Sequence, residues 1–346
     1  MKLPLHRIYA LAMSALCAPL LAQSPNQSTL TLVNEPGFNQ LAILIDIDIA
    51  GQNSQTSTLT GTIASSHNIN PDTHTNDLLD IQSATIAGSD VTFTINNILT
   101  GNITLQGQGL GADVFTVGNG AVDPNTNEFD AMEHAFTVNQ GTISGTAAGT
   151  PINQDLAATP VIGTGEGTGT LAITHTGSTG TRANYSITLT LPVNVTQEIP
   201  TGVVIFGTEL MARVTVTGTI KATGTTYVYL SPFLQWTEEN GVPAAPFTGT
   251  NFGQVPNGLL WAMGYSSSNA PTSLLKQQGS SFEIALPAGG TASDVSILHS
   301  NNLINWNPAS TTDISTGNNI IPMGSTGTIT ITPSGTMGFY RLSKPE

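Results

Sequence analysis

The chain has 346 residues, of which only 8 are Lys or Arg and 22 are Asp or Glu, so its formal net charge is −14 at pH 7. With so few cations it cannot neutralise a run of phosphates, and we expect neither a nucleic-acid partner nor docking on an anionic membrane surface. Cys17 is the single cysteine, which excludes a disulfide framework and a cysteine-rich zinc site.

Residues 1–22 have the pattern of a secretory signal peptide. Lys2 and Arg7 precede an apolar run from Ile8 to Ala22, and a polar stretch follows it. The run is shorter than the ~20 apolar residues that span a bilayer, and its small last residue fits cleavage after Ala22. We therefore predict a secreted or cell-surface protein whose mature chain lacks cysteine, with an uncleaved N-terminal anchor as the alternative.

Residues 23–230 predict one large β domain. Short runs such as Ser57–Ile63, Val91–Ile95 and Tyr185–Leu191 alternate Thr or Ser with aliphatic residues, and Gly, Asn and Asp separate them. Period-two alternation is typical of half-buried strands, and Thr suits their solvent face. Many such strands at near-regular spacing, with no helical pattern before Leu230, predict an all-β, antiparallel, Thr/Gly-rich sandwich or barrel.

Residues 231–278 predict a short helical joint. Ser231 fits a helix N-cap, Pro232 fits the first helical position, and Phe233 and Trp236 lie on one face. Asn257 is expected to cap a second short helix that ends near Gly264. Residues 279–346 then alternate again and predict a small C-terminal β-sandwich; its expected strands are 281–286, 294–299, 302–306, 327–332 and 338–342.

Four pieces of this C-terminal part carry a family resemblance. They are Phe233–Trp236, Asn257–Gly264, Val295–Trp306 and Phe339–Leu342. In order and spacing they resemble a C-terminal module of secreted proteins from Planctomycetes–Verrucomicrobia bacteria. The resemblance covers about residues 231–342 and implies secretion or surface display, without implying a reaction. The large domain resembles no family in this way.

The chain departs from that family at one loop. In similar proteins the loop before the second helix is rich in Asp, which implies calcium binding. Here the loop Pro246–Pro256 contains no carboxylate. Because a calcium ion needs about 6–8 oxygen ligands, several of them charged, we expect no calcium in this loop.

A different stretch does predict a calcium site. Asp123, Asn125 and Asn127 have the spacing of the first ligands of a calcium loop, and Asp130 adds a carboxylate. Glu128 stands where the EF-hand requires Gly, so the expected site is looser than an EF-hand. The alternative is a surface loop in which Asp and Asn side chains stabilise turns.

A second polar cluster could hold zinc through imidazole and carboxylate ligands. Its members are His67, Asp72, His74, Asp77 and Asp80. Their spacing matches no helical histidine motif, so the sequence favours a polar loop here.

Catalysis by paired carboxylates, as in glycosidases, requires two acids about 5–9.5 Å apart. The candidate acids are Glu128, Asp130, Glu133, Glu166, Glu198 and Glu209. Nothing in the sequence selects a pair among them, and no G-x-S-x-G nucleophile motif occurs. The sequence therefore predicts no specific catalytic or cofactor-binding residue.

These patterns together predict a secreted or cell-surface structural or adhesive β protein without catalytic activity. Its expected partner is a cell-surface polymer or glycan, and its oligomeric state is left open. One alternative is a glycan-binding module or glycoside hydrolase, which predicts a cleft with facing carboxylates. The other is a β-barrel that binds an apolar ligand, which predicts a closed apolar cavity.

Overall fold

The computed structural model describes residues 26–47, 50–97, 101–147, 149–205, 207–287, 292, 294–334 and 339–344. It is mostly β, with one large 13-stranded antiparallel sheet, two small antiparallel sheets and short helices. The predicted all-β fold class is confirmed. The predicted signal peptide, including Cys17, lies outside the described residues.

The large sheet contains β1 to β13. The strands are β1 (Asn26–Leu32), β2 (Gln40–Ile47), β3 (Gly51–Asn70), β4 (Thr75–Gly88), β5 (Val91–Asn97), β6 (Gly101–Thr116), β7 (Glu128–Asp130), β8 (His134–Ala147), β9 (Thr150–Asp155), β10 (Val161–Thr164), β11 (Thr168–Thr179), β12 (Arg182–Ile205) and β13 (Thr208–Tyr229). The main path runs β10-β8-β6-β4-β3-β1-β13-β12-β11-β7, and β2, β5 and β9 pair to its side. A short 3-10 helix, Ala131–Glu133, precedes β8.

Several strands are much longer than the runs expected from the sequence. β12 and β13 have 24 and 22 residues and pair from Arg182↔Tyr229 to Ile205↔Thr208. Leu189, Leu191, Val193 and Val195 of β12 are buried, and the alternate residues are partly or fully exposed. Thr, Ser and Asn continue the pairing on the solvent face, so a polar residue between two apolar ones does not end a strand.

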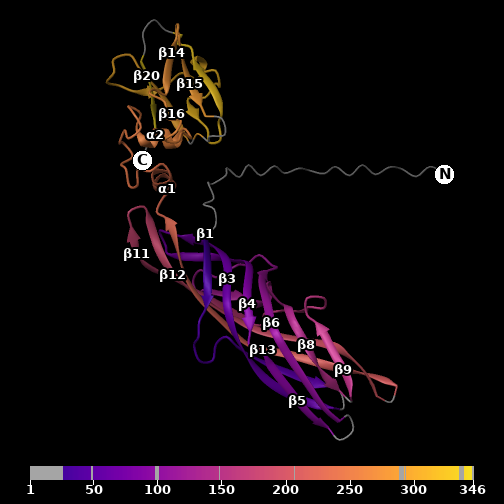
Figure 1. Ribbon diagram of the computed structural model, residues 1–346. Coiled ribbons are helices and arrows are strands. Elements are labelled where there is room, and N and C mark those ends of the chain that lie inside the picture. Colours follow the sequence, from indigo (N-terminus) through magenta and orange to yellow (C-terminus); the bar gives the residue numbers. More distant parts are fainter. Residues whose placement is uncertain are drawn as a thin grey trace, which may run out of the picture.

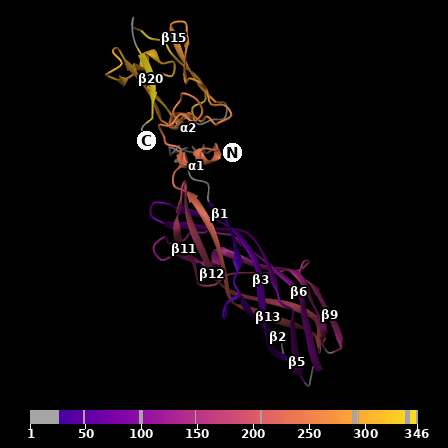
Figure 2. The same cartoon turned by 60° about the vertical axis from the view of Figure 1, so that its left-hand side comes forward.

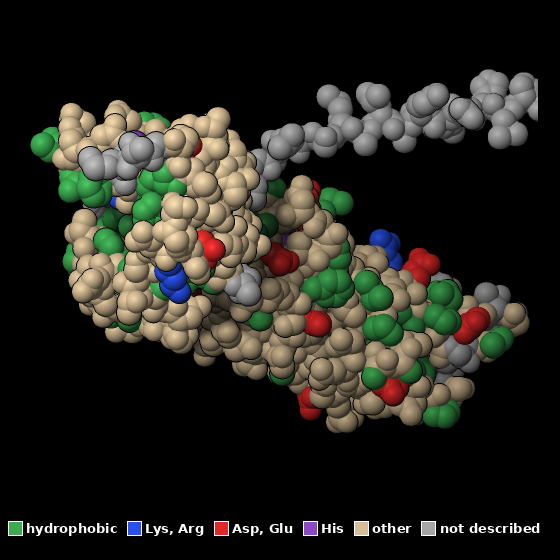
Figure 3. All heavy atoms as spheres, turned by 90° about the horizontal axis from the view of Figure 1, so that it is seen from above, with side chains coloured by type: hydrophobic (Ala, Val, Ile, Leu, Met, Phe, Trp, Pro, Cys, Tyr) green, Lys and Arg blue, Asp and Glu red, His purple; other side chains and the backbone are tan. Residues whose placement is uncertain are grey.

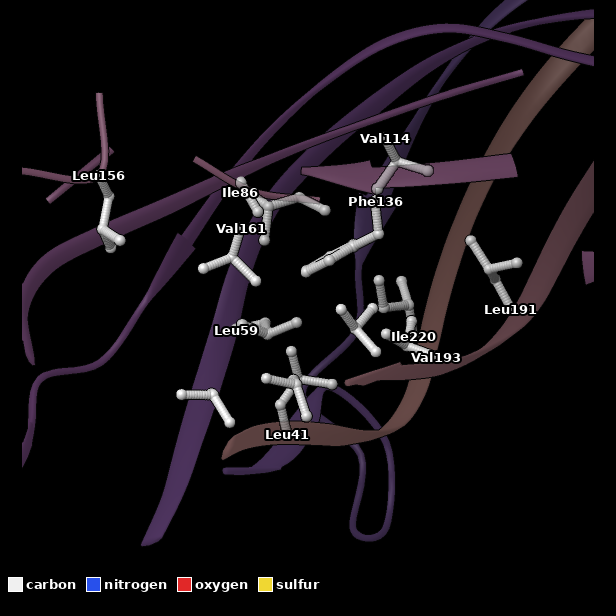
Figure 4. Packing of buried hydrophobic residues seen from close by; sticks show 14 of the residues in the cluster. Leu41, Leu59, Ile86, Val114, Phe136, Leu156, Val161, Leu191, Val193 and Ile220 are labelled. Atoms are coloured by element: carbon white, nitrogen blue, oxygen red, sulfur yellow. The ribbon is translucent and has the colours of Figure 1, made fainter. Parts of the chain in front are cut away.

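The large sheet curls until its two ends approach each other. β10 pairs with β8, and Gly165, just after β10, forms a bridge with Val193 of β12. A Cβ at Gly163 would lie 2.5 Å from the side chain of Val195, so this approach requires glycine. Hydrophobic side chains fill the enclosed space; Figure 4 shows Phe136 and Ile220 among those that lie between the strands.

The C-terminal part contains two short helices and two small sheets. The elements are α1 (Pro232–Glu239), α2 (Asn257–Ala262), β14 (Leu275–Gln278), β15 (Ser281–Leu286), β16 (Val295–Ser300), β17 (Asn307–Pro308), a 3-10 helix (Thr311–Asp313), β18 (Ile320–Ile321), β19 (Gly327–Ile331) and β20 (Phe339–Ser343). One sheet has the order β14-β15-β19, and in the other β16 pairs with β17, β18 and β20.

Three local predictions can be compared with these elements. Ser231 is the N-cap of α1, and its hydroxyl accepts a hydrogen bond from the Leu234 amide at 3.2 Å, as predicted. The predicted cap at Asn257 is wrong, because this residue is already helical and its buried side chain bonds to Asn251 and to the Pro246 carbonyl. The strand expected at 302–306 is wrong too, since a turn around Asn302 precedes β17.

The two helices and the tail share one hydrophobic core. Leu260 and Met263 are fully buried against Ile284, Ile297 and other residues of the small sheets. Trp236 packs at the edge of this core, and its indole Nε1 donates a hydrogen bond to the Tyr265 carbonyl at 2.7 Å. We call residues 231–344 the C-terminal module, because the helical joint and the tail pack as one unit.

Both ribbon views place the C-terminal module beyond one end of the large domain (Figures 1 and 2). β13 leads directly into α1, and Glu238 of α1 accepts hydrogen bonds from Arg182 and Thr181 of the large domain. Basic side chains are few on the face seen in Figure 3, as expected from the composition. Within the described residues, no helix has both the length and the apolar character that a membrane span needs.

Candidate functional site

A cleft of about 570 Å³ lies at the end of the large domain, where β13 passes into α1. The hairpin of β3 and β4 forms one wall and contributes mainly polar side chains, including Asn68, Asn70, Asp72 and Asp77. The opposite wall is the segment Tyr229–Pro232, with Pro124 beside it. We call this space the junction cleft.

The polar wall is a hairpin, where the sequence favoured a loop. β3 and β4 pair as far as Asn70↔Thr75, and only residues 71–74 form the turn. The Asn70 side-chain oxygen accepts hydrogen bonds from the backbone amides of Asp72 at 2.8 Å and Thr73 at 3.3 Å. The loop prediction is wrong because polar residues at the solvent face of a long hairpin look like loop residues in sequence.

His74 holds this turn against the body of the domain. Its backbone is left-handed, with a φ of 57°, which costs a non-glycine residue of the order of 1 kcal/mol. Its Nδ1 lies 2.9 Å from the Tyr185 hydroxyl, and its ring stacks on His175 with 4.2 Å between ring centroids. These contacts fix the turn that presents Asp72 to the cleft.

Tyr185 anchors the base of the same region. It is fully buried and packs with Ile69, Ala183 and Val228 in a small hydrophobic cluster. Burial raises the pKa of its phenol, and the nearby Asp72 carboxylate raises it further. Tyr185 therefore stays a neutral phenol that can bond to His74.

The opposite wall is held by aromatic and ionic contacts. The Tyr229 hydroxyl accepts a hydrogen bond from Arg182 at 3.3 Å, and its ring meets Tyr227 edge to face at 5.6 Å. The Arg182 guanidinium lies over the Tyr227 ring, 3.8 Å from its centroid, and forms an ion pair with Glu238. Tyr229 is thus fixed by the same contacts that join the large domain to α1.

No model of a known protein family and no curated protein matches this chain. Its function is therefore inferred from its own residues. The junction cleft combines carboxylates, amides, a hydroxyl and an aromatic ring, which can bind a polar ligand through hydrogen bonds and through contact with an apolar face.

The predicted calcium ligands lie in a turn near the cleft. The Asp123 carboxylate accepts hydrogen bonds from the backbone and side-chain nitrogens of Asn125, at 2.8 and 3.2 Å; the backbone bond is the largest influence lowering its pKa. Asn127 adopts a left-handed φ of 60°, and the Asp130 carboxylate accepts from the Met132 amide. The described residues contain no group of three or more His, Cys, Asp or Glu side chains that could hold a metal ion. Calcium binding here stays a prediction.

The five residues of the second cluster are divided among three places. Asp72, His74 and Asp77 lie in or beside the junction cleft. His67 is buried inside the sheet, whereas Asp80 is one of three carboxylates near the buried His134. The structure therefore does not bring these five residues together around one ion.

His67 and His134 are the two buried histidines among the described residues. The Nε2 of His67 lies 2.8 Å from the Ser28 hydroxyl and 3.0 Å from that of Ser65, and burial lowers its pKa to about 4. Burial is also the largest influence lowering the pKa of His134. A serine beside a histidine can act as a nucleophile, but this pair is enclosed in the core, so a substrate has no access to it.

The candidate catalytic acids are spread over the large domain. Glu128 and Asp130 line a shallow hollow of about 450 Å³ from a single strand, β7. Glu133 accepts a hydrogen bond from the Gly120 amide, and Glu166 accepts one from Asn194. Glu198 lies on β12 opposite Arg213, and Glu209 lies on β13. None of the six lines the junction cleft.

The inside of the curled sheet contains two neighbouring apolar voids of about 60 and 50 Å³. Both are lined by Ile43, Leu110, Val138 and Val216 together with other apolar side chains. Ligand pockets usually measure about 300–1,000 Å³, so these voids are small for a lipid.

The sequence pointed to residues on one wall of the junction cleft and not to those on the other. Asp72, His74 and Asp77 were singled out, whereas Tyr229, Tyr185 and the residues that support them were not. The available signal was the pair Tyr227 and Tyr229 in a Thr-rich strand with few other aromatic residues. Arg182 lies 47 residues before Tyr229 and 56 residues before Glu238, and only the fold shows that these residues meet.

Proposed function

We propose that this protein is an exported structural or adhesive β protein that acts by binding and by its shape, without catalysis. The observation that supports this most is the long β12–β13 hairpin, whose strands have 24 and 22 residues and which leads directly into the C-terminal module. At about 3.3 Å per residue such a hairpin spans roughly 70 Å. The large domain can therefore act as a spacer with the module at one end.

The composition is consistent with an extracellular location. The exposed side chains of the large strands are mostly small, polar and uncharged, and the few charges are mainly acidic. The predicted signal peptide and the resemblance of the C-terminal part to a tail of exported proteins support the same location. Export and surface display remain part of the proposal.

The proposal is tested in two steps, first location and then attachment. Cells that produce the full chain with a C-terminal tag are fractionated and treated with protease from outside. We expect the tag in the medium or at a protease-accessible surface, and we expect beads coated with the purified mature chain to attach to cells or to isolated envelope polymer. A tag that stays in the cytoplasm, or beads that attach no better than albumin-coated beads, would contradict the proposal.

The glycoside hydrolase alternative has less support from the geometry. The two carboxylates of the junction cleft, Asp72 and Asp77, both come from the β3–β4 hairpin, and Asp77 accepts a hydrogen bond from Asn68 at 2.8 Å. The two-carboxylate mechanism places one acid on each side of the scissile bond. Release of reducing sugar from a polysaccharide by the purified chain would decide in favour of the enzyme.

The apolar-ligand alternative has the least support. A lipid requires a cavity several times larger than the two voids inside the sheet. Glycan binding without hydrolysis is the second candidate function, because the junction cleft has polar and aromatic side chains on facing walls.

A further inference from the structure

We propose that the junction cleft binds a neutral oligosaccharide and that this contact mediates adhesion; the inference rests on the function proposed above. The cleft measures about 570 Å³, which is within the usual range for a small-ligand site of about 300–1,000 Å³. It can thus hold a few sugar residues of a longer chain.

The hairpin wall has hydrogen-bonding capacity that the protein does not use. The Asn70 side-chain oxygen is engaged by the turn, which leaves its NH2 group for a ligand. Asn68 donates to one oxygen of Asp77 at 2.8 Å, which leaves the second oxygen of Asp77 and the side-chain oxygen of Asn68. These side chains and Asp72 are exposed. Such a row of donors and acceptors matches sugar hydroxyls, because each hydroxyl both donates and accepts.

The facing wall offers an apolar surface. Tyr229, Leu230 and Pro232 line this wall, and their side chains contain a ring and aliphatic carbons. A pyranose has an apolar face of C–H groups that can lie on an aromatic ring while its hydroxyls bond sideways. Polar groups on one wall and an aromatic surface on the other therefore suit a sugar better than a peptide backbone or a fully apolar ligand.

Both walls are fixed before a ligand arrives. The turn that carries Asp72 is held by the contacts of His74 with Tyr185 and His175. Tyr229 is held by Arg182, which in turn is paired with Glu238. A site whose side chains are already ordered loses less conformational entropy on binding, so modest contacts suffice for measurable affinity.

The charges of the cleft disfavour an anionic ligand. An anionic sugar would meet the carboxylates of Asp72 and Asp77 on the hairpin wall and would be repelled. A divalent cation would need more oxygen ligands than these two carboxylates, and one of them is partly engaged by Asn68. Neutral hydroxyls, by contrast, form charge-assisted hydrogen bonds with both carboxylates.

The test is calorimetric titration of the full mature chain with neutral oligosaccharides, in buffer containing EDTA. The probes are hexamers of β-1,4-glucose, β-1,4-xylose, β-1,4-mannose and β-1,4-N-acetylglucosamine. At least one should bind with a micromolar to millimolar Kd, and Asp72→Asn and Tyr229→Ala should each weaken it by about tenfold or more. Tyr229→Phe should have a small effect, because it keeps the ring.

Asp46→Asn is the matched control, because Asp46 is an exposed carboxylate on β2 and does not line the cleft. It should leave the affinity unchanged. Asp72→Asn changes a single atom of an exposed side chain, so the test does not depend on whether Tyr229→Ala folds. Unchanged thermal melting of each variant confirms that lost binding is local.

Two results would overturn the inference: saturation by none of the probes at about 5 mM, or equal weakening by Asp46→Asn. The bead assay separates this inference from the proposed function. Attachment that persists in Asp72→Asn leaves the adhesive function standing and removes the cleft from it. Oligosaccharide binding by a chain whose beads do not attach supports the cleft and removes the adhesive function.

Discussion

The large domain and the C-terminal module obtain their cores in different ways. The large domain buries aliphatic side chains from long paired strands, and aromatic residues such as Phe93, Phe129 and Phe136 are few among them. The module uses short strands and two short helices, around which aromatic side chains gather: Trp236, Phe252, Trp261, Tyr265, Phe282 and Tyr340. Short elements have few ladder hydrogen bonds, so large rings supply the buried area that long strands obtain from many small side chains.

This difference makes the two parts separately observable. All three tryptophans, Trp236, Trp261 and Trp306, belong to the module, whereas most of the β-structure belongs to the large domain. Tryptophan fluorescence therefore reports on the module, and far-UV circular dichroism reports mainly on the large domain.

The largest effects are expected from cavities in the two cores. Leu189 of β12 and Leu260 of α2 are both fully buried. Replacing either by Ala should destabilise its own part by about 3–4 kcal/mol, through lost burial and the cavity left behind. Leu189→Ala should shift the circular-dichroism transition and Leu260→Ala the fluorescence transition. If either variant shifts both transitions equally, the two cores unfold as one unit.

Acid should weaken the large domain more than the module. His67 is buried with a pKa of about 4, below the 6.5 of a free histidine, so the unfolded chain takes up its proton first as pH falls. The contribution of neutral His67 to the free energy of unfolding is fully present above pH 6.5. It is lost progressively as the pH falls to 4, by about 3 kcal/mol in total. Urea unfolding at a series of pH values, followed by circular dichroism, measures this loss.

His67→Gln provides the comparison for the acid experiment. This variant removes the titrating group, so its stability should fall less steeply between pH 6.5 and pH 4. Part of the slope should remain, because burial lowers the pKa of His134 in the same direction. An unchanged slope in His67→Gln would show that other groups cause the acid sensitivity.

A smaller effect is expected at the edge of the module core. Trp236→Ala removes a half-buried ring and the hydrogen bond from its Nε1 to the Tyr265 carbonyl. We expect about 2 kcal/mol of destabilisation of the module, together with weaker coupling to the large domain. Trp236→Phe keeps a ring and should lose about half as much. Calorimetric transitions that do not change in Trp236→Ala would disprove a packing role for this residue.

The contact of Glu238 with the large domain should affect how cooperatively the two parts unfold more than it affects the stability of either part. Glu238 of α1 bonds to Arg182 and Thr181, and both charged side chains remain partly exposed. Glu238→Gln should therefore move the fluorescence and circular-dichroism midpoints apart by a small amount, because the two parts then unfold less cooperatively, and it should cost little total stability. Glu239→Gln is the matched control on the same helix, where the carboxylate accepts from Gln235. Equal behaviour of the two variants would mean that this ion pair does not couple the parts.

The smallest effect concerns the predicted calcium site, which belongs to the large domain. If Asp123, Asn125, Asn127 and Asp130 bind calcium, titration with calcium should give heat, and Asp123→Ala should remove it. The absence of heat, or the same heat in the variant, would identify the segment as a turn stabilised by its own side chains. Asp46→Asn again serves as the charge-matched control.

The sequence predicted the elements whose pattern is local. Ser231 and Pro232 located the start of α1 because a cap acts within three residues, and the alternation in 281–286 matched β15. It failed at 67–80 and at 302–306. In the first stretch β3 and β4 pair with each other across a short turn, whereas the second forms a turn before β17. Local polarity distinguished neither outcome.

In the junction cleft, too, some residues could be identified from the sequence and others could not. Asp72, His74 and Asp77 attracted attention because acids and histidines are rare in this chain and stand close together in sequence. Tyr229 faces them only because β13 runs back along the domain and ends beside the β3–β4 hairpin. The ring is held there by Arg182 and Glu238, which are 56 residues apart in sequence.

By itself, the sequence determined the class of fold, the acidic and cysteine-poor surface and the change of character near Ser231. These follow from composition and from periodicity of two, which every strand carries in its own residues. The tertiary structure alone decided how long the strands are, that the sheet curls back on itself at Gly165 and Val193, and which residues line the junction cleft together. Those features depend on pairing between strands far apart in the chain, and many polar, Thr-rich registers would look alike in sequence.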